Sequence, residues 1–494
     1  MNDYEKLKSQ FKEIGYLNRT IALLDWDHET YLPAKGVDYR AEQQAFLSGL
    51  AHHRLVGNQI RDLIESCESN QANLDSHQQV NVREWRKDYD RAVKLPTEFV
   101  ELFEKTCSLA KASWAEARKK NKFEIFSDHL GQIIELSRRK ADYYGFEHTA
   151  YDALMDVYEP GCTTQSLTPI FADLKKSIVE WLPEAIEATG DISADFLKDD
   201  YPLEGQMKFN EVVSKSLGFD FESGRIDATT HPFCTELGPH DIRLTTRYEP
   251  DDFTVSLYSV LHEAGHGLYE QGFCSEHSGT PMAEAVSLGI HESQSRLWEN
   301  KVGRAPEFWK DWYSIATQFL PALKRFSPEQ ITKAINRVSP SFIRVEADEV
   351  TYDLHIILRY ELEKALIAGD LKVTEIPAVW NEQFKLMFGL EVPNDTQGCL
   401  QDIHWSMGGF GYFPTYSLGN LNSAQLYAVA DKALGGKAGS LLEGNYQGLL
   451  EWLRSNVHQY GKQYSPGQLM EQATGEQTLP KYHWNYLKER FANL

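Results

Sequence analysis

The sequence contains no apolar run long enough to cross a membrane. A helical span needs about 20 consecutive apolar residues, and no hydrophobic stretch of the 494-residue chain approaches that length. The first 20 residues also lack the basic segment and the following apolar segment of a secretory signal. We therefore expect a protein that has no membrane partner and that works in the cytoplasm.

Cysteine is scarce, with six residues in the whole chain and no Cys-x-x-Cys pair among them. Widely spaced cysteines in a long chain do not form the disulfide framework of a small secreted fold. We expect them to act as small hydrophobic side chains in a reducing compartment. A structural zinc site built on cysteine is therefore not expected.

Basic residues are fewer than acidic ones, at 50 Lys and Arg against 72 Asp and Glu, which gives a formal net charge of −22. Nucleic-acid binding requires a positive surface, so the composition argues against a nucleic-acid partner. Hydrophobic residues make up 42% and charged residues 25%, as in soluble globular proteins. Disorder of the whole chain is thereby excluded.

Helical periodicity covers most of the chain. Within 3–27, apolar residues such as Leu7, Ile14 and Leu24 recur at three- and four-residue steps and form one stripe. Prolines lie at or near the edges of such segments, where helices tolerate them. Similar stripes predict helices over 37–67, 70–92, 96–119, 122–144, 165–187, 202–217, 253–271, 282–301, 306–320, 328–337, 349–368, 373–388, 421–433, 440–459 and 481–492.

One region, 219–250, breaks the helical pattern with glycines, prolines and alternating β-branched residues. Segments 224–230 and 241–248 predict two or three short strands of a small antiparallel sheet. No internal repeat or long linker divides the chain. We therefore predict a single, mainly α-helical domain over 1–494, with a small β-element just before its central helix.

That central helix contains the sequence Leu-His-Glu-Ala-Gly-His-Gly at 261–267. His262 and His266 are four residues apart, so on a helix both imidazoles project from one face and can bind one metal ion. Glu263 lies beside the same face, where its carboxylate can accept a proton from a water molecule that the metal activates. This is the HExxH arrangement of zinc peptidases.

Zinc catalysis needs a third protein ligand. Glu292, on the next predicted helix and 26 residues after His266, is our first candidate, and Glu284 is the alternative. His291 would then lie beside the metal or contact the substrate. Arg296 occupies the position four residues after Glu292, where some related sites carry a carboxylate, so the group that orients the histidines is undetermined.

Six short motifs occur in order along nearly the whole chain, and the N-terminal segment Leu24-Asp25-Trp26-Asp27 precedes them. Together they resemble the carboxypeptidase Taq family of metallocarboxypeptidases. The motifs are His231-Pro232-Phe233, Asp241-Ile242-Arg243-Leu244-Thr245, the segment from His262 to His266, His291-Glu292-Ser293-Gln294, Ile343-Arg344-Val345-Glu346-Ala347-Asp348 and Gly398-Cys399-Leu400-Gln401-Asp402-Ile403-His404-Trp405.

The resemblance implies a zinc-dependent exopeptidase that removes single residues from peptides with a free C-terminus. It also implies a mainly helical, often dimeric fold with a long substrate groove, similar to angiotensin-converting enzyme and neurolysin. In this picture 219–420 form the catalytic core and the helices of 1–120 cover the groove. Co²⁺ or Mn²⁺ are alternatives to Zn²⁺, because affinity order and availability both decide which metal is bound.

Related helical peptidases also suggest which groups stabilise the oxyanion. They use a His and one or two Tyr from a loop, and the Gly-rich segment 404–416 suits such a loop. We favour Tyr412 and Tyr416, followed by His404. Packing of these aromatic side chains in a turn is the alternative interpretation.

Recognition of a terminal carboxylate favours arginine, whose guanidinium donates to two oxygens at once. The resemblance points to Arg344 first and to Arg243 second. His231 belongs to a family motif and is expected to shape the groove. An extended peptide can bind along the edge of the predicted sheet.

Three other functions are considered. An endopeptidase or dipeptidase would use the same metal site and differ only at the ends of the groove. A di-iron bundle would use Glu263 and His266 as a Glu-x-x-His pair, but it needs a second such pair, which the chain lacks. A catalytically inactive binding protein is disfavoured by the intact HExxH sequence.

Overall fold

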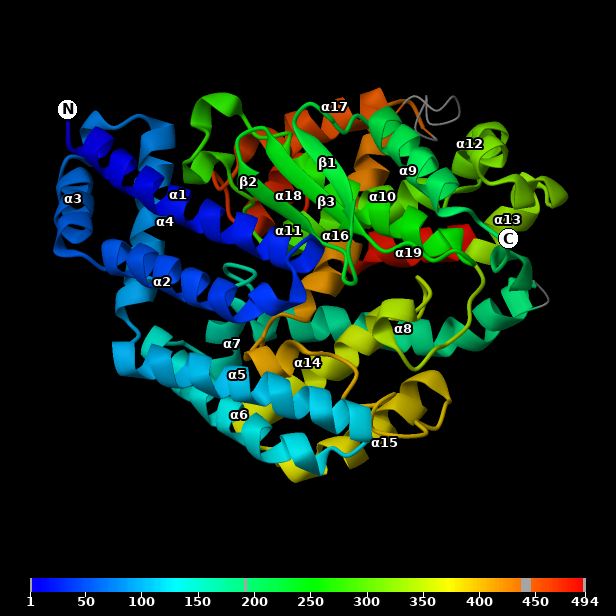
Figure 1. Ribbon diagram of the computed structural model, residues 1–494, viewed down its shortest axis with the longest axis horizontal. Helices are drawn as coiled ribbons and strands as arrows, with labels where there is room; N and C mark the ends of the chain where they lie inside the picture. Colours follow the sequence, from blue (N-terminus) through cyan, green and yellow to red (C-terminus); the bar gives the residue numbers. More distant parts are fainter. Residues whose placement is uncertain (1, 191–192, 437–445, 492–494) are drawn as a thin grey trace.

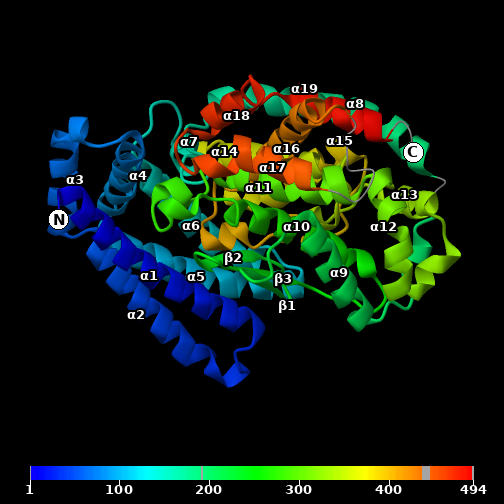
Figure 2. The ribbon, with the colours of Figure 1, turned by 90° about the horizontal axis from the view of Figure 1, so that it is seen from above.

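A computed structural model describes residues 2–190, 193–436 and 446–491. The protein is mainly helical (Figures 1 and 2). The helices are α1 (Asp3–Thr30), α2 (Val37–Leu55), α3 (Asn58–Ser69), α4 (Ser76–Val93), α5 (Thr97–Lys120), α6 (Glu124–Tyr144), α7 (Ala150–Met155), α8 (Thr164–Gly190), α9 (Leu203–Leu217), α10 (Phe253–Glu270), α11 (Leu288–Arg296), α12 (Pro306–Phe319), α13 (Pro328–Ile335), α14 (Tyr352–Ala368), α15 (Ile376–Phe388), α16 (Pro414–Ala433), α17 (Gln447–Asn456), α18 (Pro466–Thr474) and α19 (Pro480–Phe491).

Most predicted helices match observed ones. The predicted helix 37–67 is divided at Gly57 into α2 and α3, and α7 and α18 were not predicted. Residues 440–445 of the predicted helix 440–459, and residue 492, lie outside the described residues.

A three-stranded sheet lies against α10, with the strand order β1-β3-β2. The strands are β1 (Gly224–Ala228), β2 (Cys234–Gly238) and β3 (Asp241–Thr246). β2 and β3 are antiparallel as expected, but β1 pairs with β3 in parallel, with Ile226 opposite Leu244. The prediction of a purely antiparallel sheet is therefore wrong. After β1 the chain crosses to the other edge of the sheet, where it forms β2, and then turns back to form β3 between the two. β1 and β3 therefore run in the same direction.

Two large hydrophobic cores form the body. One is built mainly by α5, α6, α8, α14 and α15, and the other by the sheet with α9, α10, α12 and α17. Helix α16 joins them, because Leu418 and Leu421 lie in the first core while Leu426 and Ala430 lie in the second. In Figure 1 the first core occupies the lower half of the molecule and the sheet lies across the upper half.

The N-terminal helices form a smaller unit with its own core. Trp85 of α4 is buried there and stacks on Phe11 of α1 at 4.8 Å. Arg19 of α1 pairs with Glu236 of β2 at 3.0 Å, so this unit is attached to the sheet. Figure 2 shows α1 and α2 at the outer edge of the molecule. Helix α5 instead belongs to the first large core, and the covering role of 1–120 stays a prediction.

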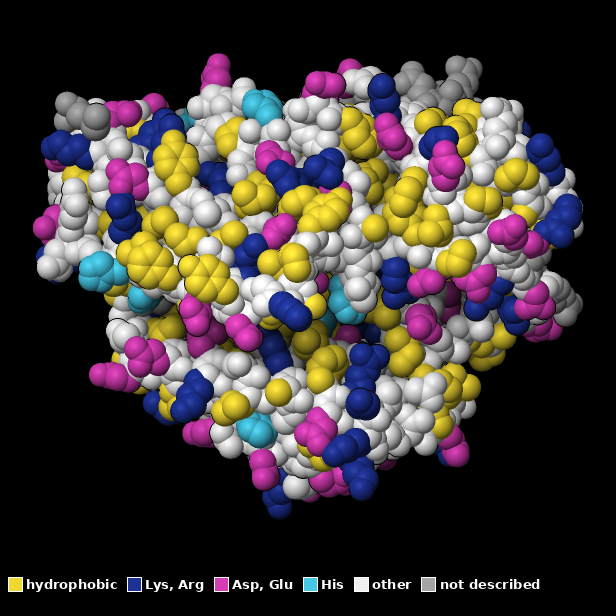
Figure 3. All heavy atoms as spheres, viewed as in Figure 1, with side chains coloured by type: hydrophobic (Ala, Val, Ile, Leu, Met, Phe, Trp, Pro, Cys, Tyr) yellow, Lys and Arg dark blue, Asp and Glu magenta, His cyan; other side chains and the backbone are white. Residues whose placement is uncertain are grey.

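Figure 3 shows the surface hollowed along the boundary between the upper and lower halves. Among the described helices, none combines the length and the apolar character that a membrane span requires. The hollow brings side chains of the two cores opposite each other, and the metal centre described next lies where the cores meet.

Candidate metal centre

Helix α10 carries the two histidines of the HExxH sequence. Asp252 caps its N-terminus by accepting the N–H of Thr254 at 2.9 Å. The apolar residues of α10, including Leu257 and Leu261, are fully buried in the second core. The four-residue spacing leaves His262 and His266 together on another face, which packs against α11.

Glu292 of α11 completes a group of three potential metal ligands, as predicted. Its Oε2 lies 3.4 Å from Nε2 of His262 and 3.5 Å from Nε2 of His266. The three ligand atoms all lie within 4.8 Å of one another. Glu284, the alternative ligand, is instead paired with Lys462 and is absent from this group.

Two glycines allow the helices to approach this closely. A Cβ at Gly265 of α10 would lie 2.6 Å from the backbone oxygen of Gln294 in α11. A Cβ at Gly419 of α16 would collide with the side chain of Glu292. Because real Cβ atoms do not approach neighbours this closely, any larger residue at 265 or 419 must displace α11.

The imidazoles are oriented by hydrogen bonds on the side opposite the ligand atoms. Nδ1 of His262 lies 2.9 Å from Oε2 of Glu299, and Nδ1 of His266 lies 3.1 Å from the backbone oxygen of His291. When each Nδ1 donates its proton to these acceptors, Nε2 of both rings presents a lone pair to the metal position.

Glu299 is the orienting carboxylate that the sequence analysis did not identify. It lies in the π-helix Leu297–Gly303, which continues directly from α11. Arg296 donates to Glu299 at 3.2 Å and to Glu292 at 2.8 Å, so one guanidinium holds the ligand carboxylate and the orienting carboxylate. The sequence feature that could have identified this carboxylate is the spacing: Glu299 lies seven residues after Glu292, two helical turns further along the chain.

Burial and charge control protonation in the centre. Burial raises the pKa of Glu263 to about 7. Burial, assisted by the neighbouring His291, lowers the pKa of His266 to about 3, which keeps this imidazole neutral. Burial also opposes ionisation of Glu299, but Arg296 and His262 together lower its pKa to about 2. Glu299 is thus ionised and the imidazole of His266 is neutral, whereas, against the effect of burial, the neighbouring Glu292 raises the pKa of His262.

These groups fit a divalent metal ion. Two imidazole nitrogens and one carboxylate oxygen are the donor set of His₂Glu zinc peptidases, and the oriented Nδ1 atoms supply the outer contacts that such sites require. The same donors also suit other divalent transition metals. Glu263 is buried beside this group and accepts no hydrogen bond from the described residues.

The predicted oxyanion residues lie together at the start of α16 and in the turn before it. Nε2 of His404 lies 3.1 Å from the hydroxyl of Tyr416, and the rings of Tyr412 and Tyr416 are 5.4 Å apart. The segment is not entirely a loop: His404–Met407 form a 3₁₀ turn, and Tyr416 lies in the first turn of α16. α16 therefore begins at Pro414, earlier than the predicted 421.

A buried glutamate holds this segment in place. Glu363 of α14 accepts hydrogen bonds from the indole N–H of Trp405 at 2.8 Å, the backbone N–H of Gly411 at 3.0 Å and the hydroxyl of Tyr151 at 2.6 Å. Burial raises the pKa of Glu363 to about 7. The segment that carries His404 is thus fixed to the first core.

Arg344 lies beside this cluster of predicted oxyanion residues. It is buried, donates to Asp402 at 2.8 Å and to the hydroxyl of Tyr352 at 2.9 Å, and lies 4.8 Å from the ring centre of Tyr416. Tyr352 also contacts the metal centre, because Arg296 stacks on its ring at 4.3 Å. Arg344 is therefore linked to the metal ligand Glu292 through two intervening side chains.

The remaining predicted residues lie in different surroundings. Arg243 of β3 pairs with Asp241 at 2.9 Å and stacks on Trp26 of α1 at 4.2 Å. His291 is stacked on His266, with ring centres 4.3 Å apart, and its Nε2 lies 2.8 Å from Glu270. His231 is exposed on the connection between β1 and β2.

Comparison with known proteins identifies relatives over the full length. The family model described as carboxypeptidase Taq (M32) metallopeptidase matches residues 6–491. Thermostable carboxypeptidase 1 of Thermus thermophilus is 39% identical over 99% of this chain and 98% of its own, and carboxypeptidase 1 of Bacillus subtilis is 36% identical over 100% and 99%. The crystal structure of an M32 carboxypeptidase from Deinococcus radiodurans has a TM-score of 0.97 at 38% identity, covering 100% of this chain and 99% of that one.

Replacing Glu299 by glutamine tests the orienting carboxylate. We expect Glu299→Gln to lower metal affinity by about 10- to 100-fold, because the hydrogen bond to His262 loses its charged acceptor. Competition with a chelator, followed by metal analysis, measures this. The exposed Glu329 of α13 provides the control, and Glu329→Gln should bind metal like the unaltered protein. Equal affinity in both variants would contradict the assignment.

Proposed function

Because the chain belongs to the carboxypeptidase Taq (M32) family of metallopeptidases, we propose a residue-by-residue mechanism for its metallocarboxypeptidase activity. The protein releases residues from the C-terminus of peptides. The observation that carries the mechanism is the convergence of His262, His266 and Glu292 on one position. We propose that this position holds one Zn²⁺, with Co²⁺ or Mn²⁺ as substitutes.

Glu263 is the proposed general base. When bound, the metal supplies a Lewis acid that makes a water molecule acidic enough to ionise near neutral pH. The Glu263 carboxylate takes the proton of that water and delivers it to the leaving amine. Its burial supports this role, since an apolar environment keeps the carboxylate poorly solvated and reactive.

The proposed oxyanion donors are Tyr412, Tyr416 and His404. Their support is the contact between His404 and Tyr416 and the packing of the two tyrosine rings against each other. Burial raises the pKa of Tyr412 and Tyr416, so both hydroxyls keep the proton that they donate. A donor that is already held in position is worth about 10²–10³ in kcat.

The proposed partner of the substrate carboxylate is Arg344. Asp402 and Tyr352 fix the plane of its guanidinium, and a fixed planar donor recognises a carboxylate at low entropic cost. Arg243 is the alternative; it pairs with Asp241 and stacks on Trp26 of α1, outside the chain of contacts that joins Arg344 to Glu292 through Tyr352 and Arg296. We propose that the peptide extends from Arg344 along the hollow of Figure 3, with β2 as the edge strand that it joins. His231, on the β1–β2 connection, and His291, beside His266, line this path.

Glu263→Gln tests the base. The amide keeps the shape of the side chain but accepts no proton, so we expect kcat to fall by about 10²–10⁴ while metal content stays at one ion per chain. Peptide hydrolysis, followed by mass spectrometry with metal analysis on the same samples, measures both quantities. The Glu329→Gln variant serves again as the control. Near-normal kcat in Glu263→Gln would exclude this role.

A pair of peptides tests exopeptidase specificity and the carboxylate partner together. A peptide with a free C-terminus should be cleaved, and its C-terminal amide should not. Arg344→Met should reduce kcat/KM for the free acid by about tenfold or more, whereas Arg243→Met should have a smaller effect. Equal cleavage of acid and amide would favour an endopeptidase, and a larger loss in Arg243→Met would move the role to Arg243.

We also propose a homodimer that resides in the cytoplasm. All six cysteines are free thiols, which suits a reducing compartment. The α1–α2 pair carries large exposed side chains, among them Tyr39 and Phe46 at 69% and 67% exposure, and an apolar surface of this kind suits a partner. Sedimentation analysis should give a mass twice that of the chain, and Phe46→Ser should shift it toward the monomer. A monomeric unaltered protein would exclude this assembly.

A further inference from the structure

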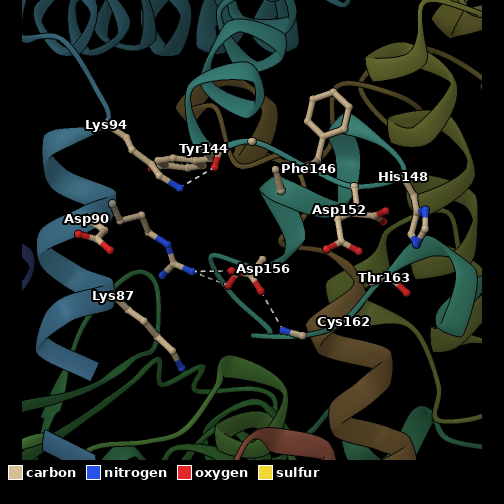
Figure 4. Close-up of a pocket in the computed structure, with 15 residues that line it drawn as sticks. Lys87, Asp90, Lys94, Tyr144, Phe146, His148, Asp152, Asp156, Cys162 and Thr163 are labelled. Carbon is tan, nitrogen blue, oxygen red and sulfur yellow. Dashed lines mark hydrogen bonds and ion pairs between the residues drawn. The ribbon is translucent and has the colours of Figure 1, made fainter. Parts of the chain in front are cut away.

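A cavity of about 460 Å³ lies apart from the metal centre. It is enclosed by the last turns of α4, the connection from α6 to α7 and the turn that precedes α8 (Figure 4). This volume is typical of sites for small organic ligands. None of the three metal ligands, and none of the residues proposed for catalysis, lines it. Its chemistry therefore needs a separate explanation.

The α4 wall of the cavity carries three cationic side chains and one carboxylate, Asp90, which pairs with Arg86 at 3.5 Å. Lys87, Arg91 and Lys94 are spaced by four and three residues, which places them on one helix face, and Figure 4 shows Lys87 and Lys94 on the α4 side of the cavity. Lys87 is paired with Glu84 at 2.8 Å. Arg91 is already paired with Asp156 at 2.7 Å. Lys94 donates only to the backbone oxygen of Tyr144 at 2.7 Å, and no described carboxylate lies within ion-pair distance of it. Its charge is therefore available to an anionic group.

The opposite wall is acidic. Asp152 of α7 is buried and faces the cavity from the side opposite α4 (Figure 4). Its carboxylate accepts the backbone N–H of Thr164 at 2.6 Å and that of Thr149 at 3.3 Å. An ionised carboxylate has about four acceptor positions, so further positions remain for a cationic donor. The two walls thus carry opposite charge.

An apolar surface completes the cavity. Tyr144, Phe146 and Ala153 line it, and Phe146 is 44% exposed. A ligand that matches these walls carries a carboxylate, an ammonium group and an apolar side chain. A free α-amino acid with an apolar side chain carries all three on one carbon, and the flexible four-carbon stem of Lys94 allows its ammonium group to approach the carboxylate of such a ligand.

The turn that forms the floor of the cavity also contacts Tyr412 and the start of α11. Asp156 and Thr163 line the cavity, and between them Tyr158 packs on Tyr412 with ring centres 5.1 Å apart. Glu159 accepts the backbone N–H of Gly289 at 2.8 Å in the first turn of α11. The turn 156–163 thus lines the cavity on one side and supports α11, the helix of Glu292, on the other.

We propose that this cavity is a second ligand site that binds a free α-amino acid. Lys94 and Lys87 bind its carboxylate, Asp152 binds its ammonium group, and Tyr144 and Phe146 contact its side chain. The carboxypeptidase reaction releases such molecules, and the choice of this ligand rests on the function proposed above. The reaction product thereby has a binding place outside the catalytic centre.

Calorimetric titration of the metal-loaded enzyme with L-phenylalanine tests the site. Lys94→Met should weaken binding by about tenfold or more, because a charge-assisted contact is lost, and Lys87→Met should weaken it less. Lys119→Met, at an exposed position of α5, is the matched control and should bind like the unaltered enzyme. L-Phenylalaninamide and N-acetyl-L-phenylalanine, which lack one of the two charges, should both bind more weakly.

Two results would overturn the inference. One is the absence of saturable binding, and the other is unchanged affinity in both Lys94→Met and Lys87→Met, which would place the amino acid at the metal centre. Equal binding of N-acetyl-L-phenylalanine would remove Asp152 from the site and indicate a peptide C-terminus as the ligand. Peptide hydrolysis, measured on the same preparations, keeps the proposals separate: binding without hydrolysis contradicts only the proposed function, and hydrolysis without binding contradicts only this site.

Discussion

The metal centre depends on how closely three helices approach one another. Helix α11 passes between α10 and α16, and glycines at 265 and 419 remove the side chains that would keep it away. The Glu292 carboxylate can then reach both imidazoles of α10. Burial on both sides leaves α11 little freedom to shift, since side chains packed at the density of a protein interior resist displacement.

Buried charge extends this arrangement across the boundary between the two cores. Arg296 binds Glu292 and stacks on Tyr352, and Tyr352 accepts a hydrogen bond from Arg344. Asp402 holds Arg344 and also pairs with Arg359. Removal of one partner from a buried charge network leaves the charges of the others uncompensated. The network is therefore kept intact, and it fixes the position of Arg344 relative to the metal ligands.

Much of the fold and the metal ligands could be predicted because they depend on local spacing. Helical periodicity identified most helices, and the four-residue separation of His262 and His266 required only that the segment be helical. Glu292 was predictable because a turn separates two consecutive helices, which allows them to pack antiparallel with Glu292 facing the two histidines. The direction of β1 was not predictable, since it depends on how the chain passes β3.

Other parts of the site depend on contacts distant in sequence. Glu363 fixes the segment of His404 from a helix about 40 residues earlier, and Glu159 supports α11 from about 130 residues earlier. No periodicity or short motif signals such pairs. The start of α16 at Pro414 was missed because the preceding glycines suggested a longer loop. The roles of Tyr412, Tyr416, His404 and the two arginines are still predictions.

The π-helix after α11 makes the number of residues between Glu292 and Glu299 critical. Each residue of a regular helix rotates the next by about 100°, and the wider π turn sets the direction in which Glu299 points. Deleting or inserting a single residue in this stretch would swing the carboxylate away from His262 even if every other side chain were retained. Natural variation within 293–298 should therefore consist of substitutions at constant length, and length changes should be confined to the segments outside it.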